Sequence, residues 1–149
     1  MSADPDTLTL VCEDFMGICN SPDTPIATPQ GDRAIATLRV GDLVYSVDHG
    51  AVVAVPVLRA TRTPVFHHRV VHLELDSGVV LEISSLHPTA DGRTLGGLRA
   101  GDVLDGARVL SAQRVPYRFE HTYDILPASD TGTYFAAGVR LGSTLAAAR

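Results

Sequence analysis

The sequence predicts an all-β domain that contains an internal duplication, and three observations lead to this prediction. Its 149 residues are near the commonest size of a single domain, so we expect one hydrophobic core. Its 17 valines and 13 threonines favour strands, and segments with the pattern of a long helix are scarce. A short block also recurs at an offset of 60 positions, which is typical of a duplicated structural unit.

The expected strands follow one another through most of the chain. Residues 1–24 are rich in proline and aspartate, and we expect an extended lead-in there. Residues 49–50 and 76–78 each suit a tight hairpin turn, whereas residues 61–64 are expected to interrupt a strand. The predicted strands are 43–48, 51–60, 65–75, 79–83, 108–118, 122–126 and 134–140.

The recurring block carries turn chemistry. Residues 38–43 recur as 98–103, and a shorter block upstream recurs at an offset of 61. In each copy a glycine precedes an aspartate, which suits a turn with positive φ followed by a strand. Coincidence between two similar turns is the alternative explanation. If the copies pack about a pseudo-two-fold axis, the segments just before them, which hold Cys19 and His87, can meet at its centre.

Charge and composition restrict the partners. The 12 basic residues, all arginines, face 17 acidic ones, and the net charge of −5 argues against a nucleic-acid partner. No apolar run approaches the roughly 18 residues of a membrane span, and the N-terminus lacks the pattern of a signal peptide. The absence of lysine points to a GC-rich bacterial genome. We expect a monomer with no membrane partner, and export as part of a longer bacterial protein stays open.

Cys19 is the first candidate for chemistry. A thiol at its ordinary pKa is only a few per cent ionised at pH 7, so a nucleophilic cysteine needs activation. One interpretation is attack on the carbonyl of Ile18, with Gly17 permitting a strained backbone. The alternatives are a buried small side chain or a disulfide between Cys12 and Cys19.

Two further segments carry polar groups at strand ends or on inward faces. Ser84 and His87 lie three residues apart at the end of a predicted strand, although a lone histidine there is often a surface or core residue. Asp124 alternates with apolar neighbours, so its carboxylate is expected to point inward and to need a partner. An aspartate that caps a turn is the alternative.

The histidines raise the question of a metal site. His67, His68 and His72 lie close in sequence, and His87 and His121 are further candidates. On one strand, His68 and His72 would share a face at a separation of roughly 13 Å, which is too far for one ion. We therefore expect no metal and no other cofactor.

Three blocks, in this order, resemble the Hint module that is shared by inteins, bacterial intein-like domains and the C-terminal part of Hedgehog proteins. Residues 19–42 resemble its N-terminal splicing block. Residues 84–88 resemble its Thr-x-x-His block, with Ser84 in place of threonine, and residues 123–139 resemble its C-terminal block. The resemblance implies a horseshoe-shaped β fold with pseudo-two-fold symmetry. It also implies an upstream flank at 1–18, the Hint domain at 19–143 and a tail at 144–149.

The resemblance also implies a self-processing reaction with a single turnover. Cys19 would attack the carbonyl of Ile18 and replace the peptide bond by a thioester. His87 would protonate the departing nitrogen of Cys19, and Ser84 would hold the peptide or orient His87. Asp124 would assist proton movement or orient groups near Cys19. The substrate would be the domain's own N-terminal flanking polypeptide.

Two departures from the family pattern narrow the activity. Splicing modules end in His-Asn, but Gly142 and Ser143 occupy those positions, and Ser143 has no side-chain amide that could cyclise. No acidic residue lies between Asp48 and Glu74, which disfavours transfer to a sterol. The expected activity is N-terminal cleavage through a thioester that is opened by water, a thiol or an amine. The alternative is a degenerate, inactive Hint-fold module that acts in protein–protein interaction.

Overall fold

Strands and turns account for the structure of residues 20–145, the part of the chain that this computed structural model describes. No α-helix occurs in this part, and its short 3-10 helices are not long and apolar enough to cross a membrane. The prediction of an all-β domain is confirmed. Its elements are β1 (Pro25–Ile26), β2 (Arg33–Ala34), the 3-10 helix η2 (Ile35–Thr37), β3 (Leu43–Asp48), β4 (Ala51–Pro64), β5 (Arg69–Leu75), β6 (Val80–Ile83), the 3-10 helix η3 (Leu95–Gly97), β7 (Val103–Leu104), β8 (Ala107–Pro116), β9 (His121–Pro127), β10 (Tyr134–Ala136) and β11 (Val139–Leu141).

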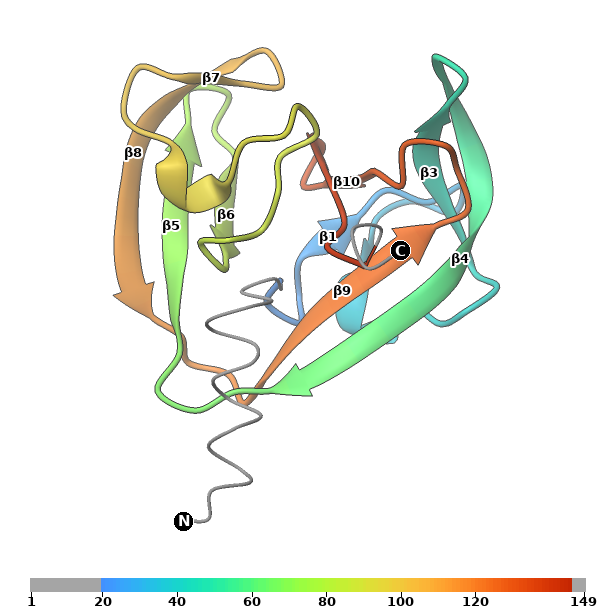
Figure 1. Cartoon of the computed structure of the whole chain (residues 1–149), viewed down its shortest axis with the longest axis horizontal. Coiled ribbons are helices and arrows are strands. Elements are labelled where there is room, and N and C mark those ends of the chain that lie inside the picture. The colour runs from blue at the N-terminus through green and yellow to red at the C-terminus, as the bar shows by residue number, and fades with distance from the viewer. Residues whose placement is uncertain (1–19, 146–149) are drawn as a thin grey trace.

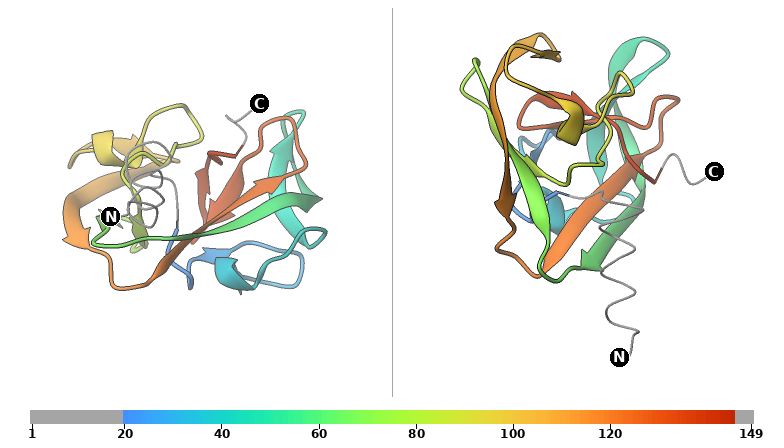
Figure 2. Two further views of the ribbon diagram at one scale, coloured as in Figure 1. Left: turned by 60° about the horizontal axis from the view of Figure 1, so that its bottom comes forward. Right: turned by 60° about the vertical axis from the view of Figure 1, so that its left-hand side comes forward.

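The chain forms three sheets, of which two belong to separate lobes and the third lies between the lobes. One lobe contains the sheet β3-β4-β9 and the other the sheet β6-β5-β8-β7, while β11-β10-β1-β2 lies between the lobes. The lobes form the two arms of a U in Figure 1, and the turned views of Figure 2 show β4 and β9 running together from one arm toward the other. The horseshoe-shaped fold is therefore confirmed.

Most predicted strands are present, but β4 differs from the prediction. It continues through residues 61–64, where a break was expected, because these residues pair with β9, as in Thr61 opposite Asp124. Pro64 is the last residue of the strand, a position where its missing N–H removes nothing from the ladder. The next strand also begins later than predicted, at Arg69, because His67 takes a left-handed conformation with φ of 54°.

The single strand predicted at 134–140 is a hairpin. β10 and β11 are antiparallel, with Tyr134 opposite Leu141. Ala137 and Gly138 form the turn with φ of 51° and 82°, and two consecutive positive φ values are typical of a type I′ turn. Alanine is uncommon at a position with positive φ, so of the two turn residues only Gly138 indicated a turn in the sequence.

The duplication is present at the level of individual hydrogen bonds. Gly41 and Gly101 have φ of 96° and 98°, as expected for a position that favours glycine. The N–H of Gly41 donates to the carbonyl of Val57 at 2.9 Å, and the N–H of Gly101 donates to the carbonyl of Val109 at 2.8 Å. In both copies the turn therefore bonds to the second strand of the hairpin that follows it, β4 in one lobe and β8 in the other.

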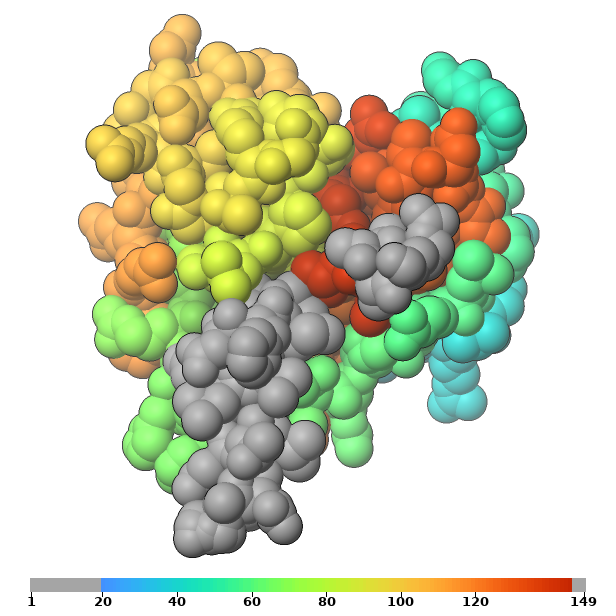
Figure 3. All heavy atoms as spheres, viewed as in Figure 1, coloured from blue at the N-terminus to red at the C-terminus, as the bar shows by residue number. Residues whose placement is uncertain are grey.

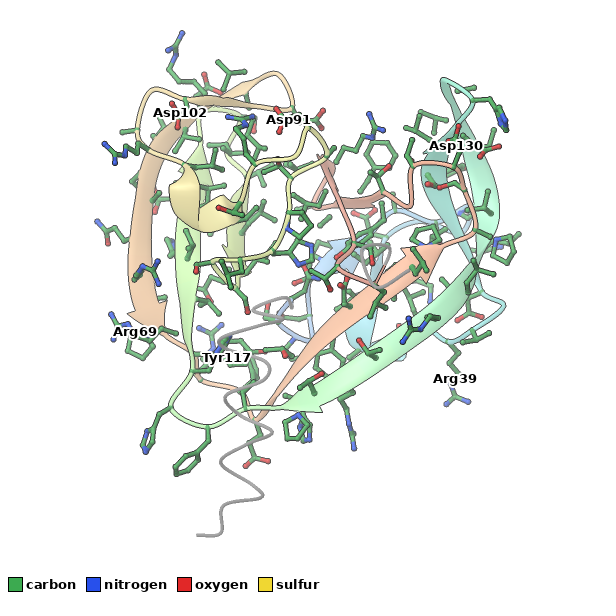
Figure 4. The ribbon with its side chains drawn as sticks, in the orientation of Figure 1. Arg39, Arg69, Asp91, Asp102, Tyr117 and Asp130 are labelled. Atoms are coloured by element: carbon green, nitrogen blue, oxygen red, sulfur yellow. The ribbon has the colours of Figure 1, made fainter. Side chains whose placement is uncertain are left out.

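The aspartates of the repeat close both turns. Oδ2 of Asp42 accepts the N–H of Arg39, and Oδ2 of Asp102 accepts the N–H of Arg99, both at 2.9 Å. The two turns lie in opposite lobes, as the labelled residues Arg39 and Asp102 show in Figure 4. This pairing across the lobes is what a pseudo-two-fold duplication requires.

The core between the lobes contains polar as well as apolar side chains. Ile26, Leu73, Ile83, Leu95 and Leu141 are among its fully buried apolar members. The same interior holds a set of buried polar residues, and burying polar groups is costly unless they are hydrogen-bonded. They include Asn20, Ser84, His87, Thr122 and Asp124.

Candidate active site

The hydroxyl of Tyr134, at the start of β10, connects three buried polar side chains. It donates to Oδ1 of Asp124 at 2.8 Å and accepts from Nδ2 of Asn20 at 2.8 Å. Nε2 of His87 lies 3.2 Å from the same oxygen. A buried tyrosine usually finds a partner for its hydroxyl, and here it finds three. Residues from both ends and the middle of the described chain therefore meet at one oxygen.

Asn20 is held between the two lobes by its main chain. Its N–H donates to the carbonyl of Tyr123 at 2.7 Å and its carbonyl accepts the N–H of Tyr123 at 2.9 Å. It also forms an antiparallel bridge with Ile83, the last residue of β6. Asn20 directly follows Cys19, which lies outside the described residues, as do Cys12, Gly17 and Ile18. The residue that directly follows the candidate nucleophile is therefore fixed between β6 and β9.

Asp124 points inward from β9, as the alternation predicted, and four donors satisfy its carboxylate. Oδ1 accepts from Tyr134 and from the N–H of Ile125 at 2.9 Å. Oδ2 accepts from the N–H and the hydroxyl of Thr144 at 3.1 and 2.7 Å. Burial raises the pKa of Asp124 above its ordinary value of 3.8, and His87 and these hydrogen bonds oppose that shift only in part.

His87 faces the C-terminal block. Its Nε2 lies 2.8 Å from the carbonyl oxygen of Gly142, and because a carbonyl can only accept, Nε2 must carry a proton. Nδ1 is therefore the ring nitrogen whose protonation can change. The backbone of His87 is held by Ser84, whose carbonyl accepts the N–H of His87 at 3.1 Å. Ser143 is buried beside this contact, and its hydroxyl accepts the N–H of Leu145 at 3.2 Å.

Ser84 makes its side-chain hydrogen bond to a residue that the sequence did not assign to the site. Its Oγ lies 2.8 Å from Nε2 of His68, and both side chains are buried. Burial lowers the pKa of His68, so the neutral ring is favoured. His72, by contrast, bonds Glu82 at 2.7 Å and Glu74 at 3.3 Å. The two histidines considered together as metal ligands thus serve different partners.

Sequence reasoning missed four members of this arrangement. The sequence offered only general reasons to consider two of them. A buried tyrosine such as Tyr134 usually needs a partner for its hydroxyl, and Asn20 directly follows the candidate nucleophile. Thr144 was assigned to the tail, and His68 was weighed only as a metal ligand. All four act through contacts between segments far apart in the chain, which spacing along the sequence does not reveal.

One group in the described part of the chain has the proximity of metal ligands. Asp48, His49 and Asp130 offer ligand atoms within 4.8 Å of one another, at the exposed end of the β3–β4 hairpin where Figure 4 labels Asp130. Their carboxylates already accept hydrogen bonds, including that of the His49 N–H to Asp130 at 3.1 Å. The group shares no residue with the buried site.

The sequence profile of the Hint domain family matches residues 18–96, which is just over half of the chain. The chain belongs to the Hint domain family. This match takes in Ser84 and His87 of the site. Asp124 and Tyr134 lie beyond the matched range, where the likeness rests on the fold.

Solved structures agree with the Hint fold. The bacterial intein-like domain from Clostridium thermocellum is 22% identical, with a TM-score of 0.73 over 85% of this chain and 99% of that one. The gp41-1 intein is 23% identical, with a TM-score of 0.68 over 84% of this chain and 98% of that one. A DnaB intein from Synechocystis sp. PCC 6803 is 15% identical, with a TM-score of 0.66 over 84% of this chain and 97% of that one. No curated protein matches the chain in sequence.

Proposed function

We propose that this Hint domain cleaves its own chain between Ile18 and Cys19 through a thioester. The observation that carries the proposal is the buried arrangement of His87, Asp124 and Tyr134 around Asn20, the residue that directly follows Cys19. Titratable groups buried in contact with one another are costly to maintain and are concentrated at functional sites. The family to which the chain belongs includes self-processing domains, which agrees with this activity.

The first step is an N–S acyl shift. The sulfur of Cys19 bonds to the carbonyl carbon of Ile18, and the bond from that carbon to the nitrogen of Cys19 breaks. The thiol proton ends on the nitrogen, so the step needs no other reagent. In an unstrained peptide the shift runs uphill. A strained backbone residue typically raises the energy of the peptide by about 1–3 kcal/mol. Each hydrogen-bond donor to the oxyanion lowers the activation free energy by about 3–4 kcal/mol.

His87 is the proposed carrier of that proton. Because its Nε2–H is bound to Gly142, Nδ1 would take the proton from the thiol of Cys19 and deliver it to the departing nitrogen. The ring is briefly an imidazolium in this step. Asp124 lies on the other side of Tyr134 and favours that positive charge while its carboxylate is ionised. Its proposed role is therefore to support the protonated form of His87.

The second step releases the N-terminal flank. Water, a thiol or an amine adds to the thioester carbonyl, and the carbon–sulfur bond breaks, which restores the thiol of Cys19. With water, the flank leaves with a carboxylate at Ile18. The domain therefore acts once on its own polypeptide, with no step that needs a metal or a cofactor.

The C-terminal end is proposed to stay intact. Ser143 stands where a splicing module has asparagine, and it has no side-chain amide to cyclise. Its hydroxyl oxygen accepts a hydrogen bond from the N–H of Leu145. We therefore propose one-sided processing rather than splicing.

Intact mass spectrometry tests the proposed reaction. Purified protein is incubated with and without a small thiol, and loss of the mass of residues 1–18 is followed over time. We expect thiol-dependent cleavage in the wild type and none in Cys19→Ala. Cleavage that persists in this variant would exclude Cys19 as the nucleophile. A wild type that stays intact under both conditions would favour the inactive interaction module.

A further inference from the structure

Ser84 and His68 form a buried pair beside the candidate site. Their side chains are 0% and 4% exposed, with 2.8 Å between Oγ and Nε2. The antiparallel register of β5 and β6, which sets Val71 opposite Ile83, makes the two residues diagonal neighbours on the adjoining segments. Diagonal neighbours are within reach of a long side chain. The hydrogen bond thus follows from the strand pairing.

The main chain at Ser84 is fixed on both sides, next to the residue that follows Cys19. Ile83 bridges to Asn20, and the carbonyl of Ser84 accepts the N–H of His87. Rotation about χ1 then decides where the Ser84 oxygen lies. Serine has three staggered χ1 rotamers, whereas a second substituent on Cβ restricts threonine.

His68 is itself held in place. Its carbonyl accepts the N–H of Tyr117 at 2.8 Å. The two rings meet edge to face, with centroids 5.6 Å apart. Figure 4 labels Tyr117 near the end of this lobe where β5 begins. A fixed, buried imidazole therefore holds the Ser84 hydroxyl through this hydrogen bond.

We propose that His68 is a positioning residue for the cleavage reaction, because its Nε2 holds the Ser84 hydroxyl in one rotamer at the strand end that bridges to Asn20. This inference rests on the proposed function. In physical terms, His68 supplies the restraint that the methyl group of a threonine would supply at position 84. The need for His68 should therefore largely disappear in Ser84→Thr.

A double-mutant cycle tests this coupling. We measure the rate of thiol-dependent loss of residues 1–18 in His68→Leu, in Ser84→Thr and in the double variant. We expect His68→Leu to slow cleavage about tenfold beside serine, the factor given by roughly 1.4 kcal/mol, which is the scale of one hydrogen bond. Beside threonine the rate should fall less than about threefold, which corresponds to less than roughly half of that free energy. His68→Gln, which keeps a polar group, should recover part of the rate.

A matched control and a second measurement separate positioning from folding. His72→Leu makes the same substitution in β5, where the partner is Glu82, and should leave the rate unchanged. Three-bond NMR couplings report χ1 of residue 84 without any need for activity. We expect a single rotamer in the wild type and averaged couplings in His68→Leu.

The outcomes are distinct. Equal rate losses beside serine and threonine, or a single Ser84 rotamer that persists in His68→Leu, would overturn the role of His68. If the wild type does not cleave at all, the proposed function fails, and the NMR couplings still decide whether His68 sets the Ser84 rotamer. Melting temperatures of all variants identify any that fail to fold.

Discussion

The phenol oxygen of Tyr134 is the atom on which the buried site depends. It satisfies one donor of Asn20 and one acceptor site of Asp124, and it lies within reach of His87. Because all four side chains are buried, water cannot replace a missing partner. Single changes at this position should therefore affect folding and chemistry together.

Tyr134→Phe removes the oxygen and keeps the ring. It leaves Nδ2 of Asn20 with one partner fewer and Oδ1 of Asp124 with only the N–H of Ile125. We expect a loss of unfolding free energy of about 1–3 kcal/mol, measured by urea titration. We also expect slower cleavage at Ile18. A variant as stable and as fast as the wild type would show that the hydroxyl links nothing of consequence.

The pH dependence of stability tests the state of Asp124. Burial raises its pKa in the folded protein above 3.8, so the folded state holds this proton more tightly than the unfolded chain does. The resulting contribution to stability is fully present below pH 3.8 and declines as the pH rises toward the folded pKa. Asp124→Asn removes the titration. The stability of the wild type relative to this variant should fall with rising pH, and a rise would contradict the assignment.

At the scale of elements, the two 3-10 helices of the repeat differ in one informative position. Gly96 in η3 takes the place that Ala36 holds in η2. A Cβ on Gly96 would lie 2.6 Å from Cβ of Ser85, and its N–H already donates to the Ser85 carbonyl at 2.8 Å. The second copy therefore needs glycine because η3 packs directly on the segment that carries Ser84 and His87.

Gly96→Ala should disturb the site through that contact. We expect a loss of about 1–3 kcal/mol in unfolding free energy, typical of overpacking, together with slower cleavage because Ser85 must shift. Gly101→Ala is the matched control: its added Cβ meets no atom within 4 Å, and its cost comes from φ of 98°. At similar destabilisation, this control should cleave faster than Gly96→Ala. Equal rates would mean that stability alone governs cleavage.

The elements also show what the sequence could predict. The hairpin turns, the duplicated Gly-Asp turns and most of the predicted strands are local features, and the structure confirms them. The continuation of β4 through residues 61–64 could not be predicted from the local sequence, because it depends on pairing with β9. The same distinction holds in the site. His87 and Asp124 lie in recognisable blocks, whereas the bond of Ser84 to His68 and the linking hydroxyl of Tyr134 exist only after the strands have paired.

At the scale of the whole molecule, the C-terminal segment is enclosed between the lobes. Figure 3 shows residues of the C-terminal block, in red, between the yellow atoms of one lobe and the orange atoms of the other. Gly142 donates its N–H to the carbonyl of Pro88 at 3.1 Å, and Leu141 is fully buried. The peptide bond after Ser143 thus lies in a packed setting, and the residue before it is a serine, which has no side-chain amide.

Reporters at both ends of the chain test one-sided processing. We expect the reporter placed before Met1 to be released after thiol addition, and the reporter placed after Arg149 to stay attached to the domain. Gel mobility and intact mass identify each product. Ligation of the two reporters, or scission after Ser143, would return splicing to consideration.

The position of Thr144 has a consequence for timing during synthesis. Its two hydrogen bonds complete the carboxylate of Asp124, and β1 pairs with β10, so the first and last parts of the domain are built into the same interior. A ribosome adds residues at about 5–20 per second, so Thr144 emerges roughly 6–25 s after Asn20. The junction at Ile18 leaves the ribosome before the rest of the domain, yet the groups proposed to cut it assemble last. The proposed cleavage would therefore be delayed until translation of the domain is finished.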